Sequence, residues 1–298
     1  MKNIYAYGMI SQSTLVRLEG VFPSENGYAE IADTHMMVSG ETGNSSQVLS
    51  NWGYHVKVDG PWLGDNSANF VSQYLKDRNI DATRLHHEIN YQGIEEIVLS
   101  VSTSRTVLGG YKRLLFTTKQ WNDPCEEDIQ WADLVSIDPQ FGNEALLAAK
   151  LAKKHNKPLL GIDCRFDDEI LQFFDTIVIG DPYLQNWYGD RDRNELFEIY
   201  SSRFKGLLIF TMGEKPLWFS RNGKQKTAMD VFSIMPVDTT GAGDTFRAGL
   251  AHGMLSCWDD LEMLKFSAAA AALNCMKFPG VQNAPALHEI DKFMKNEG

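Results

Sequence analysis

Four short apolar runs in the second half of the chain constrain its fold more than any other feature. They read ADLVSID at 132–138, KPLLGID at 157–163, DTIVIGD at 175–181 and KGLLIFTMG at 205–213. Helical patterns such as NEALLAAKLAKKH (143–155) separate most of them. Strands that alternate with helices are typical of a parallel sheet that is buried on both faces. We therefore predict an α/β fold: a doubly wound, mostly parallel sheet covered by helices on both faces, with ligands bound beyond the carboxyl ends of its strands.

Two segments do not follow this alternation. Residues 12–38 and 91–118 are rich in β-forming and turn residues, and no helical pattern lies within them. We predict that they form a small β-sheet lid beside the main core. With 298 residues, of which 43% are hydrophobic, the chain can bury a large core, and we expect residues 1–298 to form a single domain that includes the lid.

Charge and cysteine content narrow the range of partners and compartments. The formal net charge of -11 opposes binding to nucleic acid or to an anionic membrane, because the average surface field would repel either. No segment is long and apolar enough to read as a signal peptide or a membrane span. The cysteines have no C-x-x-C spacing, which favours buried free thiols in a cytoplasmic protein; they are Cys125, Cys164, Cys257 and Cys275.

The stretch PVDTTGAGDTFRAGL at 236–250 joins a glycine-rich turn to an amphipathic segment. Phe246, Leu250 and Met254 recur every four residues, which predicts a helix that begins near residue 242. Unpaired amides and the positive end of the helix dipole converge at such a start and favour an anion. Asp244 is then either a first-turn carboxylate that complements the dipole or a base that deprotonates a hydroxyl as a phosphoryl group is transferred.

Residues 238–249, which read DTTGAGDTFRAG, resemble the C-terminal signature of the ribokinase-type (PfkB) carbohydrate kinase family. Four other segments are similar to family elements in the same order along nearly the whole chain. SGETGNSSQVLSNWG (39–53) resembles the N-terminal Gly-Gly…Asn segment, with Ser39 in place of the first glycine; the others are GDN (64–66), the nucleotide loop FTMGEKP (210–216) and the glycine loop Phe278-Pro279-Gly280.

This resemblance implies ATP-dependent phosphorylation of a primary hydroxyl on a sugar or sugar-like small molecule. Asp244 would be the general base, and the amides of Gly241, Ala242 and Gly243, with that of Asp244, would form the anion hole. Magnesium would arrive with ATP, and potassium activation stays open. The remaining implied roles are acceptor binding by Ser13, Gly40, Asn44 and Arg165, nucleotide binding by Thr211, Gly213 and Gly280, and monovalent-cation binding by Asp238 and Thr240.

The sequence departs from the family pattern at two acidic positions. Ser13 stands where the family carries an aspartate that binds sugar hydroxyls, and a serine cannot hold two hydroxyls as a charged acceptor. The Asn-x-x-Glu element that organises magnesium is replaced by GDPYLQN at 180–186, where Asp181 matches the asparagine and Leu184 the glutamate. Asp181 either holds a metal-bound water or caps a helix. Pro216 also replaces a common glycine in the nucleotide loop.

Several charged residues keep two interpretations. Arg165 either touches substrate or pairs with Asp167 or Asp168 at the surface. Arg105 and Lys112, in the predicted lid, either meet an acidic substrate or are solvated. The adjacent His86 and His87 would point apart, which favours solvent exposure over a metal site.

Three functional interpretations follow from the residues and the resemblance. The leading one is a carbohydrate kinase, and because the family often dimerises through the lid, it carries the expectation of a homodimer. The departure at Ser13 raises a kinase for a nucleoside or another non-sugar alcohol. Leu184 and Ser39 raise a catalytically weak relative that binds a sugar or nucleotide as a sensor. The intact 241–244 loop with its base opposes the sensor, which needs neither.

Overall fold

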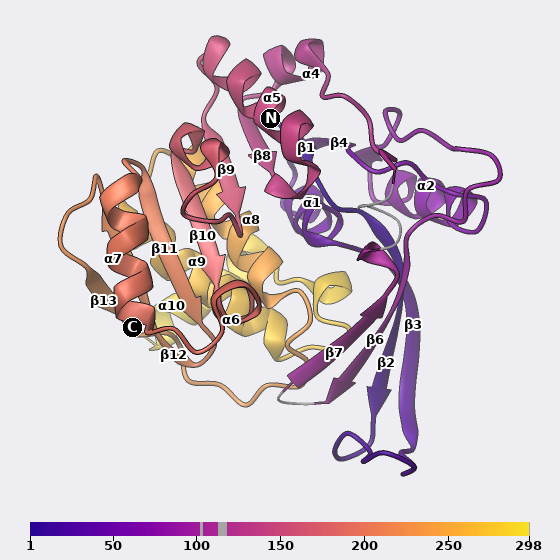
Figure 1. Cartoon of the computed structure of the whole chain (residues 1–298). Helices are drawn as coiled ribbons and strands as arrows, with labels where there is room; N and C mark the ends of the chain where they lie inside the picture. The colour runs from indigo at the N-terminus through magenta and orange to yellow at the C-terminus, as the bar shows by residue number, and fades with distance from the viewer. Residues whose placement is uncertain (102–103, 113–117, 298) are drawn as a thin grey trace.

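A twisted sheet of parallel strands forms the centre of the molecule (Figure 1). The computed structural model describes residues 1–101, 104–112 and 118–297. Within them the main sheet has the order β13-β12-β11-β10-β9-β8-β1-β4-β5, in which only β12 and β13 are antiparallel to their neighbours. The strands are β1 (Asn3–Tyr7), β4 (His55–Asp59), β5 (Ile80–Asp81), β8 (Leu134–Ile137), β9 (Leu159–Ile162), β10 (Thr176–Gly180), β11 (Leu207–Met212), β12 (Lys215–Arg221) and β13 (Thr227–Met229).

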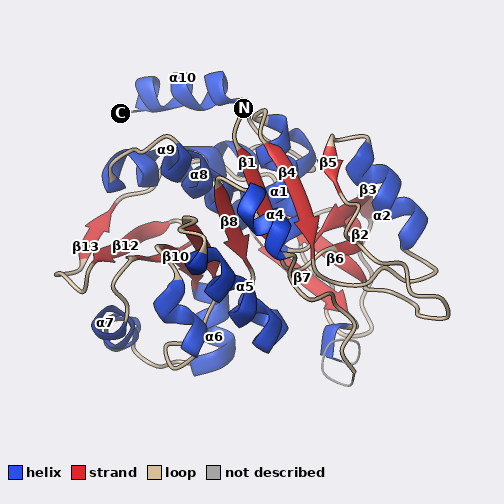
Figure 2. Ribbon diagram, turned by 90° about the horizontal axis from the view of Figure 1, so that it is seen from above, coloured by secondary structure: helices blue, strands red, loops and turns tan. Residues whose placement is uncertain are grey.

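Helices cover both faces of this sheet (Figure 2). Side chains alternate between the faces of a strand, so Ile4 and Ala6 of β1 belong to one buried cluster and Tyr5 and Tyr7 to the other. The predicted doubly wound α/β fold is confirmed. Helices of the first cluster are α1 (Glu41–Asn51), α2 (Ala68–Lys76), α8 (Ala242–Leu255), α9 (Asp260–Cys275) and α10 (Leu287–Glu297); those of the second are α4 (Glu126–Trp131), α5 (Gly142–Lys154), α6 (Asp181–Tyr188) and α7 (Arg193–Arg203).

A separate small sheet projects from the core on the side to which the arrowheads of β9 and β10 point (Figure 1). Its strands, in the order β3-β2-β6-β7, are β2 (Ser11–Leu18), β3 (Ile31–Ser39), β6 (Glu95–Val101) and β7 (Ser104–Gly109). The predicted lid is therefore a real sheet. Of its predicted segment 91–118, residues 102–103 and 113–117 lie outside the described residues.

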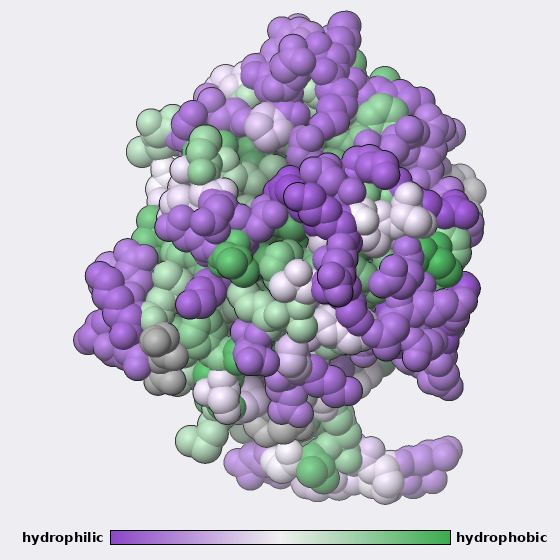
Figure 3. All heavy atoms as spheres, turned by 90° about the vertical axis from the view of Figure 1, so that its left-hand side faces the viewer, coloured by the Kyte–Doolittle hydropathy of each residue, from purple (hydrophilic) through white to green (hydrophobic). Residues whose placement is uncertain are grey.

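The surface in Figure 3 is dominated by hydrophilic side chains, with apolar atoms in separate patches between them. Among the described residues, no helix has the length and apolar content needed to cross a membrane. All four cysteines are free thiols, as predicted. Their predicted burial holds for Cys164 and Cys275 but is wrong for Cys257, which follows the end of α8 and is exposed.

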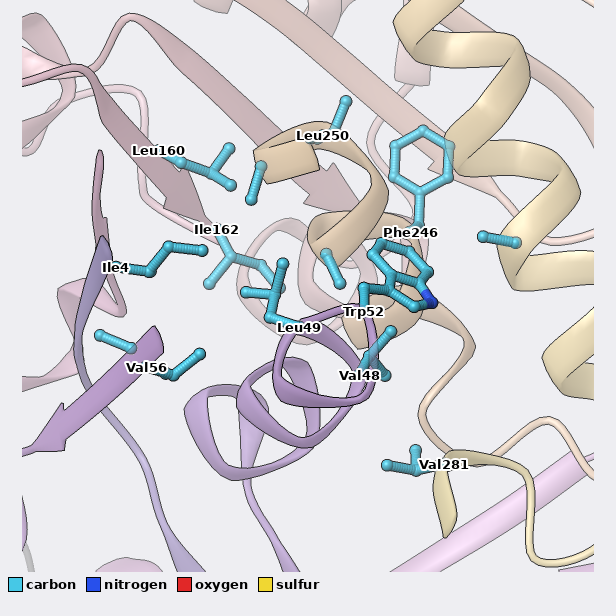
Figure 4. Close-up of a cluster of buried hydrophobic side chains, with 14 of the residues drawn as sticks. Ile4, Val48, Leu49, Trp52, Val56, Leu160, Ile162, Phe246, Leu250 and Val281 are labelled. Carbon is cyan, nitrogen blue, oxygen red and sulfur yellow. The ribbon is translucent and has the colours of Figure 1, made fainter. Parts of the chain in front are cut away.

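Apolar packing brings the amino-terminal ends of α1 and α8 together over the carboxyl edge of the sheet. Val48 and Leu49 of α1 and Leu250 of α8 belong to one buried cluster with side chains from β1, β4 and β9 (Figure 4). Trp52 of α1 belongs to the same cluster and donates its indole N–H to the Pro285 carbonyl at 2.7 Å. Because both helices pack on the same apolar cluster, the polar residues of their first turns are held next to each other.

Candidate active site

The loop 238–244 ends at the start of α8, as the glycine-rich turn predicted. Gly241 precedes the helix in the left-handed region, with φ 73°. A Cβ at this position would lie 2.0 Å from Cγ2 of Val281, so only glycine fits without moving the loop 278–282. The amides of Gly243 and Asp244 lie in the first turn, where no intrahelical carbonyl accepts from them. The Ala242 amide donates a long bond, 3.3 Å, to the Thr239 carbonyl.

Asp244 lies in the first turn of α8, partly buried, and is held from the neighbouring helix. Asn44 of α1 donates from Nδ2 to Oδ2 of Asp244 at 2.7 Å, although 200 residues separate them. Burial raises the pKa of Asp244 to about 6, while the Asn44 hydrogen bond and the charges of Arg105 and Arg247 oppose the rise. A carboxyl group with this pKa is ionised at neutral pH and is still basic enough to accept a proton from a hydroxyl.

The segment that leads into α1 supplies the neighbours of this pair. Gly40 has φ 85°, and a Cβ there would lie 2.5 Å from the Met9 carbonyl oxygen, so glycine allows α1 to start against the end of β1. Ser39 Oγ accepts a 3.5 Å hydrogen bond from Asn44 Nδ2. Oδ1 of Asn44 is buried and has no partner among the described residues.

Ser13, predicted to contact the acceptor, lies on β2 and is 1% exposed. Its hydroxyl has no hydrogen-bond partner within the described residues. A buried hydroxyl without a hydrogen-bond partner is costly, so such groups mark places where a ligand or water completes the hydrogen bonding.

Further carboxyl groups gather at the same edge of the sheet. Burial, together with the negative charges of Asp138 and Asp244, raises the pKa of Glu41, at the start of α1, to about 8. Burial likewise raises the pKa of Asp163 to about 7. Asp163 follows β9 and accepts a 2.8 Å hydrogen bond from the Gly180 amide. The edge is therefore rich in weakly acidic groups.

A fully buried ion pair lies beneath this edge, and the sequence analysis missed it. Arg247, one turn after Asp244, donates from Nη1 to Oδ1 of Asp138, which follows β8. The two side chains are 1% and 0% exposed. Oδ2 of Asp138 accepts from the Met9 amide at 2.7 Å and from the Thr42 hydroxyl at 2.8 Å. One carboxylate thus joins β1, α1 and β8 to the helix that carries Asp244.

The inner face of the lid contacts the loop 238–244. Ser100 of β6 donates its hydroxyl to Oδ1 of Asp238 at 2.8 Å. The sequence left the roles of Arg105 and Lys112 open. Arg105 of β7 donates to the Thr239 carbonyl at 3.3 Å and so contacts the loop, whereas Lys112 is exposed. The lid also contacts the glycine loop, because Cζ of Arg17 lies 4.8 Å from the centroid of the Phe278 ring.

Of the residues predicted to bind nucleotide, Thr211 and Gly213 lie at the end of β11, and Gly280 lies next to the loop 238–244. Thr211 lies in β11 next to Gly180 of β10, and Gly213 follows that strand with φ 64°. The Gly280 amide approaches Oδ2 of Asp238 at 3.5 Å. Asn274 of α9 donates to the Thr240 carbonyl at 3.1 Å, which fixes the loop from its other side.

Two predicted site residues have partners that do not belong to this cluster. Asp181 is the first residue of α6, so the capping residue is Gly180 and not Asp181. Oδ1 of Asp181 accepts a hydrogen bond of 2.6 Å from Nε of Arg193. Arg165 forms a two-point ion pair with Asp167, at 2.9 and 2.6 Å, which is the surface pair that its sequence left open.

The two adjacent histidines pair with different carboxylates. His86 lies 2.9 Å from Glu88 and His87 2.9 Å from Asp65, and both rings are about half exposed. No cluster of three or more His, Cys, Asp or Glu side chains suited to a metal ion occurs in the described part of the chain.

Comparison with known proteins gives one family and one fold. The family model described as pfkB family carbohydrate kinase matches residues 1–286. A protein of Dictyostelium discoideum named "Uncharacterized sugar kinase" is 24% identical, and the match spans 98% of this chain and 97% of that protein. The ribokinase of Arabidopsis thaliana, solved with ribose and ATP, superposes with a TM-score of 0.78 at 19% identity, covering 99% of both chains.

A nucleoside kinase of Methanocaldococcus jannaschii, described as an archaeal member of the ribokinase family, has the same fold. It superposes with a TM-score of 0.74 at 17% identity over 99% of both chains. At such identities the superpositions establish the fold, which serves both sugar and nucleoside kinases and so leaves the acceptor open. The family model covers nearly the whole chain and confirms the resemblance of residues 238–249. The chain therefore belongs to the pfkB family of carbohydrate kinases, which makes it an ATP-dependent carbohydrate kinase.

Proposed function

We propose that this kinase transfers the γ-phosphoryl group of ATP to a primary hydroxyl of a sugar or sugar-like small molecule, with Asp244 as the general base. The observation that carries the proposal is the hydrogen bond of 2.7 Å between Asn44 and Asp244 at the start of α8. It places an ionisable carboxyl group beside free first-turn amides and below a lid that can exclude water.

Each residue of this arrangement has a chemical role in the proposal. Asp244 accepts the proton of the attacking hydroxyl, and Asn44 orients the carboxylate. The amides of residues 241–244 stabilise the negative charge of the transferring phosphoryl group, and glycine at 241 and 243 lets that group approach the backbone. Ser13, Gly40 and Asn44 would contact the acceptor, while Thr211, Gly213 and Gly280 would border the nucleotide. Arg165 remains a weaker candidate for acceptor contact because it is paired with Asp167.

The described residues also fit magnesium, which the family resemblance implied, and potassium, which it left open. Magnesium would be held mainly by ATP phosphates, where it offsets their charge, and Asp181 keeps one carboxylate oxygen that is not bonded to Arg193 for a metal-bound water. A potassium ion would be held by Asp238 and Thr240. Asp238 is fully buried, and the Thr240 hydroxyl is buried without a partner in the described part of the chain, so both side chains have oxygen atoms suited to a cation.

A single assay tests the proposed reaction. ADP release is measured with ATP, magnesium and potassium against pentoses, ketohexoses, aldohexoses, sugar acids and nucleosides. Turnover with at least one acceptor that carries a primary hydroxyl supports the proposal. Tight binding of an acceptor without ADP formation would contradict it and favour the sensor interpretation.

The pH dependence of turnover is a second prediction. Because Asp244 must be ionised to accept a proton, kcat/KM for the acceptor at saturating ATP should rise about tenfold per pH unit up to a pKa of about 6 or higher, then level off. Bound phosphates add negative charge near the carboxyl group, which raises the pKa of Asp244 and moves the acid limb of the profile to higher pH. A profile that stays flat between pH 5 and 7 would contradict the assignment of Asp244.

Arg105 and Lys112 provide the matched controls for this profile. The charge of Arg105 lowers the pKa of Asp244, so Arg105→Gln should move the acid limb to higher pH. Lys112→Gln removes the same charge from an exposed position of the lid region and should leave the limb in place.

We also propose a homodimer formed through the outer face of the lid. Met36, Thr14, Ile97 and Leu108 lie side by side in register across all four strands, and the three apolar members are about half exposed. A second copy of the chain could cover this row. We expect sedimentation to give twice the mass of 33.6 kDa, and Ile97→Lys to give the monomer. A monomeric wild-type protein at micromolar concentration would contradict the dimer.

A further inference from the structure

Glu96 is a buried carboxylate on the side of the lid that faces the core. Glu96, Val98 and Ser100 alternate along β6 and so share one face of the sheet. The Ser100 hydroxyl on that face reaches Asp238 of the core at 2.8 Å, which identifies it as the inner face. Glu96 is 7% exposed, unusual for a glutamate unless a partner or a ligand compensates it.

Glu96 and Ser13 are direct neighbours across two strands. They are paired in the parallel register of β2 and β6, so their side chains lie side by side on the inner face. Ser13 carries the hydroxyl without a partner in the described residues, and Glu96 accepts a hydrogen bond from the hydroxyl of Tyr111. Position 13 itself carries no carboxylate, and the register of β2 against β6 shows that the adjacent strand provides one.

A continuous series of neighbours joins this pair to the proposed base. The Tyr111 hydroxyl that bonds Glu96 also lies 3.5 Å from Ser11 Oγ, and Ser11 is paired in register with Ser39. Asn44 Nδ2 lies 3.5 Å from Ser39 Oγ and 2.7 Å from Asp244. Two atoms that lack a partner among the described residues, Oγ of Ser13 and Oδ1 of Asn44, belong to this series.

We propose that Glu96 binds hydroxyl groups of the acceptor and makes the site selective for a neutral, hydroxyl-rich molecule. This inference rests on the proposed function. A carboxylate accepts hydrogen bonds from two hydroxyls at once, and the hydroxyl of Ser13 beside it can donate to a third oxygen. Together they perform what an aspartate at position 13 would do, with the charge moved to the neighbouring strand.

The charge around the site sets the class of acceptor. Besides Glu96, the carboxyl group of Asp244 is ionised at neutral pH, and Arg247 is already paired with Asp138. Arg105 reaches the loop 238–244, where the phosphoryl group would be. The carboxylate of a sugar acid would meet like charges here, so neutral pentoses, hexoses or nucleosides are favoured over D-gluconate and related acids.

The rival explanation is that Glu96 only holds Tyr111 and so fixes the lid. Three variants separate the two explanations. Glu96→Gln removes the carboxylate, and Tyr111→Phe removes only its internal partner. Glu95→Gln removes the same charge from the next residue, whose carboxylate accepts from Gln12 and Asn66, each at 3.2 Å.

The experiment measures ADP release from the full-length enzyme with D-ribose, D-fructose, adenosine and D-gluconate, and steady-state constants with whichever gives turnover. Glu96→Gln should raise KM for the acceptor about 10- to 100-fold, the loss expected for a hydrogen bond to a charged group, with KM for ATP unchanged. Glu95→Gln should leave both constants unchanged. An effect of Tyr111→Phe as large as that of Glu96→Gln would overturn the inference in favour of the structural role.

Moving the carboxylate back tests the inference independently of lid stability. Adding Ser13→Asp to the Glu96→Gln variant should restore at least a tenth of the acceptor affinity that Glu96→Gln loses. The added carboxylate lies on β2, beside position 96 and on the same face of the lid. Failure of this rescue, or turnover with D-gluconate as the best acceptor, would overturn the inference and leave the kinase assignment intact. If the wild-type enzyme releases no ADP with any pentose, hexose, sugar acid or nucleoside, the proposed function is overturned and the inference with it.

Discussion

Asp244→Asn is expected to lower kcat by about 10³-fold, within the range that general-base catalysis contributes, while leaving the dissociation constant for ATP nearly unchanged. The asparagine keeps the shape of the side chain and can still accept a hydrogen bond from Asn44, which donates to Oδ2 at 2.7 Å in the wild type. What is lost is the ability to take a proton, which matters only as the phosphoryl group is transferred. The measurement is steady-state turnover, together with ATP binding by calorimetry.

The stability of the same variant shows whether lost turnover comes from misfolding. Burial raises the pKa of Asp244 in the folded protein to about 6, so ionisation of this group disfavours the folded state. That cost is absent below the pKa of the unfolded chain, about 3.8, and is fully present above pH 6. Asp244→Asn should therefore match the wild type in free energy of unfolding at pH 4 and equal or exceed it at pH 8.

The control for this pair of measurements is Glu127→Gln, which removes a carboxylate that is 90% exposed on α4. It should leave turnover and stability unchanged. An Asp244→Asn enzyme that loses ATP affinity but keeps its rate at saturating ATP would show that the carboxylate positions nucleotide and is not the base.

Much of the fold could be predicted because its signals are local. The apolar runs at 132–138, 157–163, 175–181 and 205–213 became β8, β9, β10 and β11, since a strand buried on both faces needs a short continuous apolar segment. The start of α8 at Ala242 followed from glycine, dipole and periodicity within a dozen residues. The position of Asp244 in the first turn of this helix could therefore be predicted from the sequence alone.

The parts of the site that could not be predicted depend on contacts between distant residues. Asn44 and Asp244 are 200 residues apart, and Arg247 and Asp138 are 109 apart. In the sequence, Arg247 reads as one more polar residue on a helix, and Glu95 and Glu96 read as equivalent neighbours. Only the register of β6 against β2 turns Glu96 inward beside Ser13 and Glu95 away from it. Glycine patterns indicate backbone shape, whereas side-chain pairing across the sheet leaves no local trace.

Arg247→Met is expected to lower the free energy of unfolding by about 3–5 kcal/mol, because it leaves the Asp138 carboxylate buried without a counter-charge. Asp138 is 0% exposed and cannot recover hydration, and the Met9 amide and Thr42 hydroxyl alone must then compensate it. Urea unfolding followed by circular dichroism measures the loss. The same substitution at Arg221, whose pair with Asp260 is partly exposed, should cost less than about 1 kcal/mol.

A double variant shows whether the charge or the packing of Arg247 matters. In the Arg247→Met background, Asp138→Asn removes the orphaned charge, and its amide oxygen can still accept from the Met9 amide. Part of the lost stability should therefore return. If the double variant is as unstable as Arg247→Met alone, the loss comes from the packing of the arginine and not from the uncompensated charge. A return of stability without a return of turnover would further show that the ion pair sets the position of α8, since Asp244 lies one turn before Arg247 on that helix.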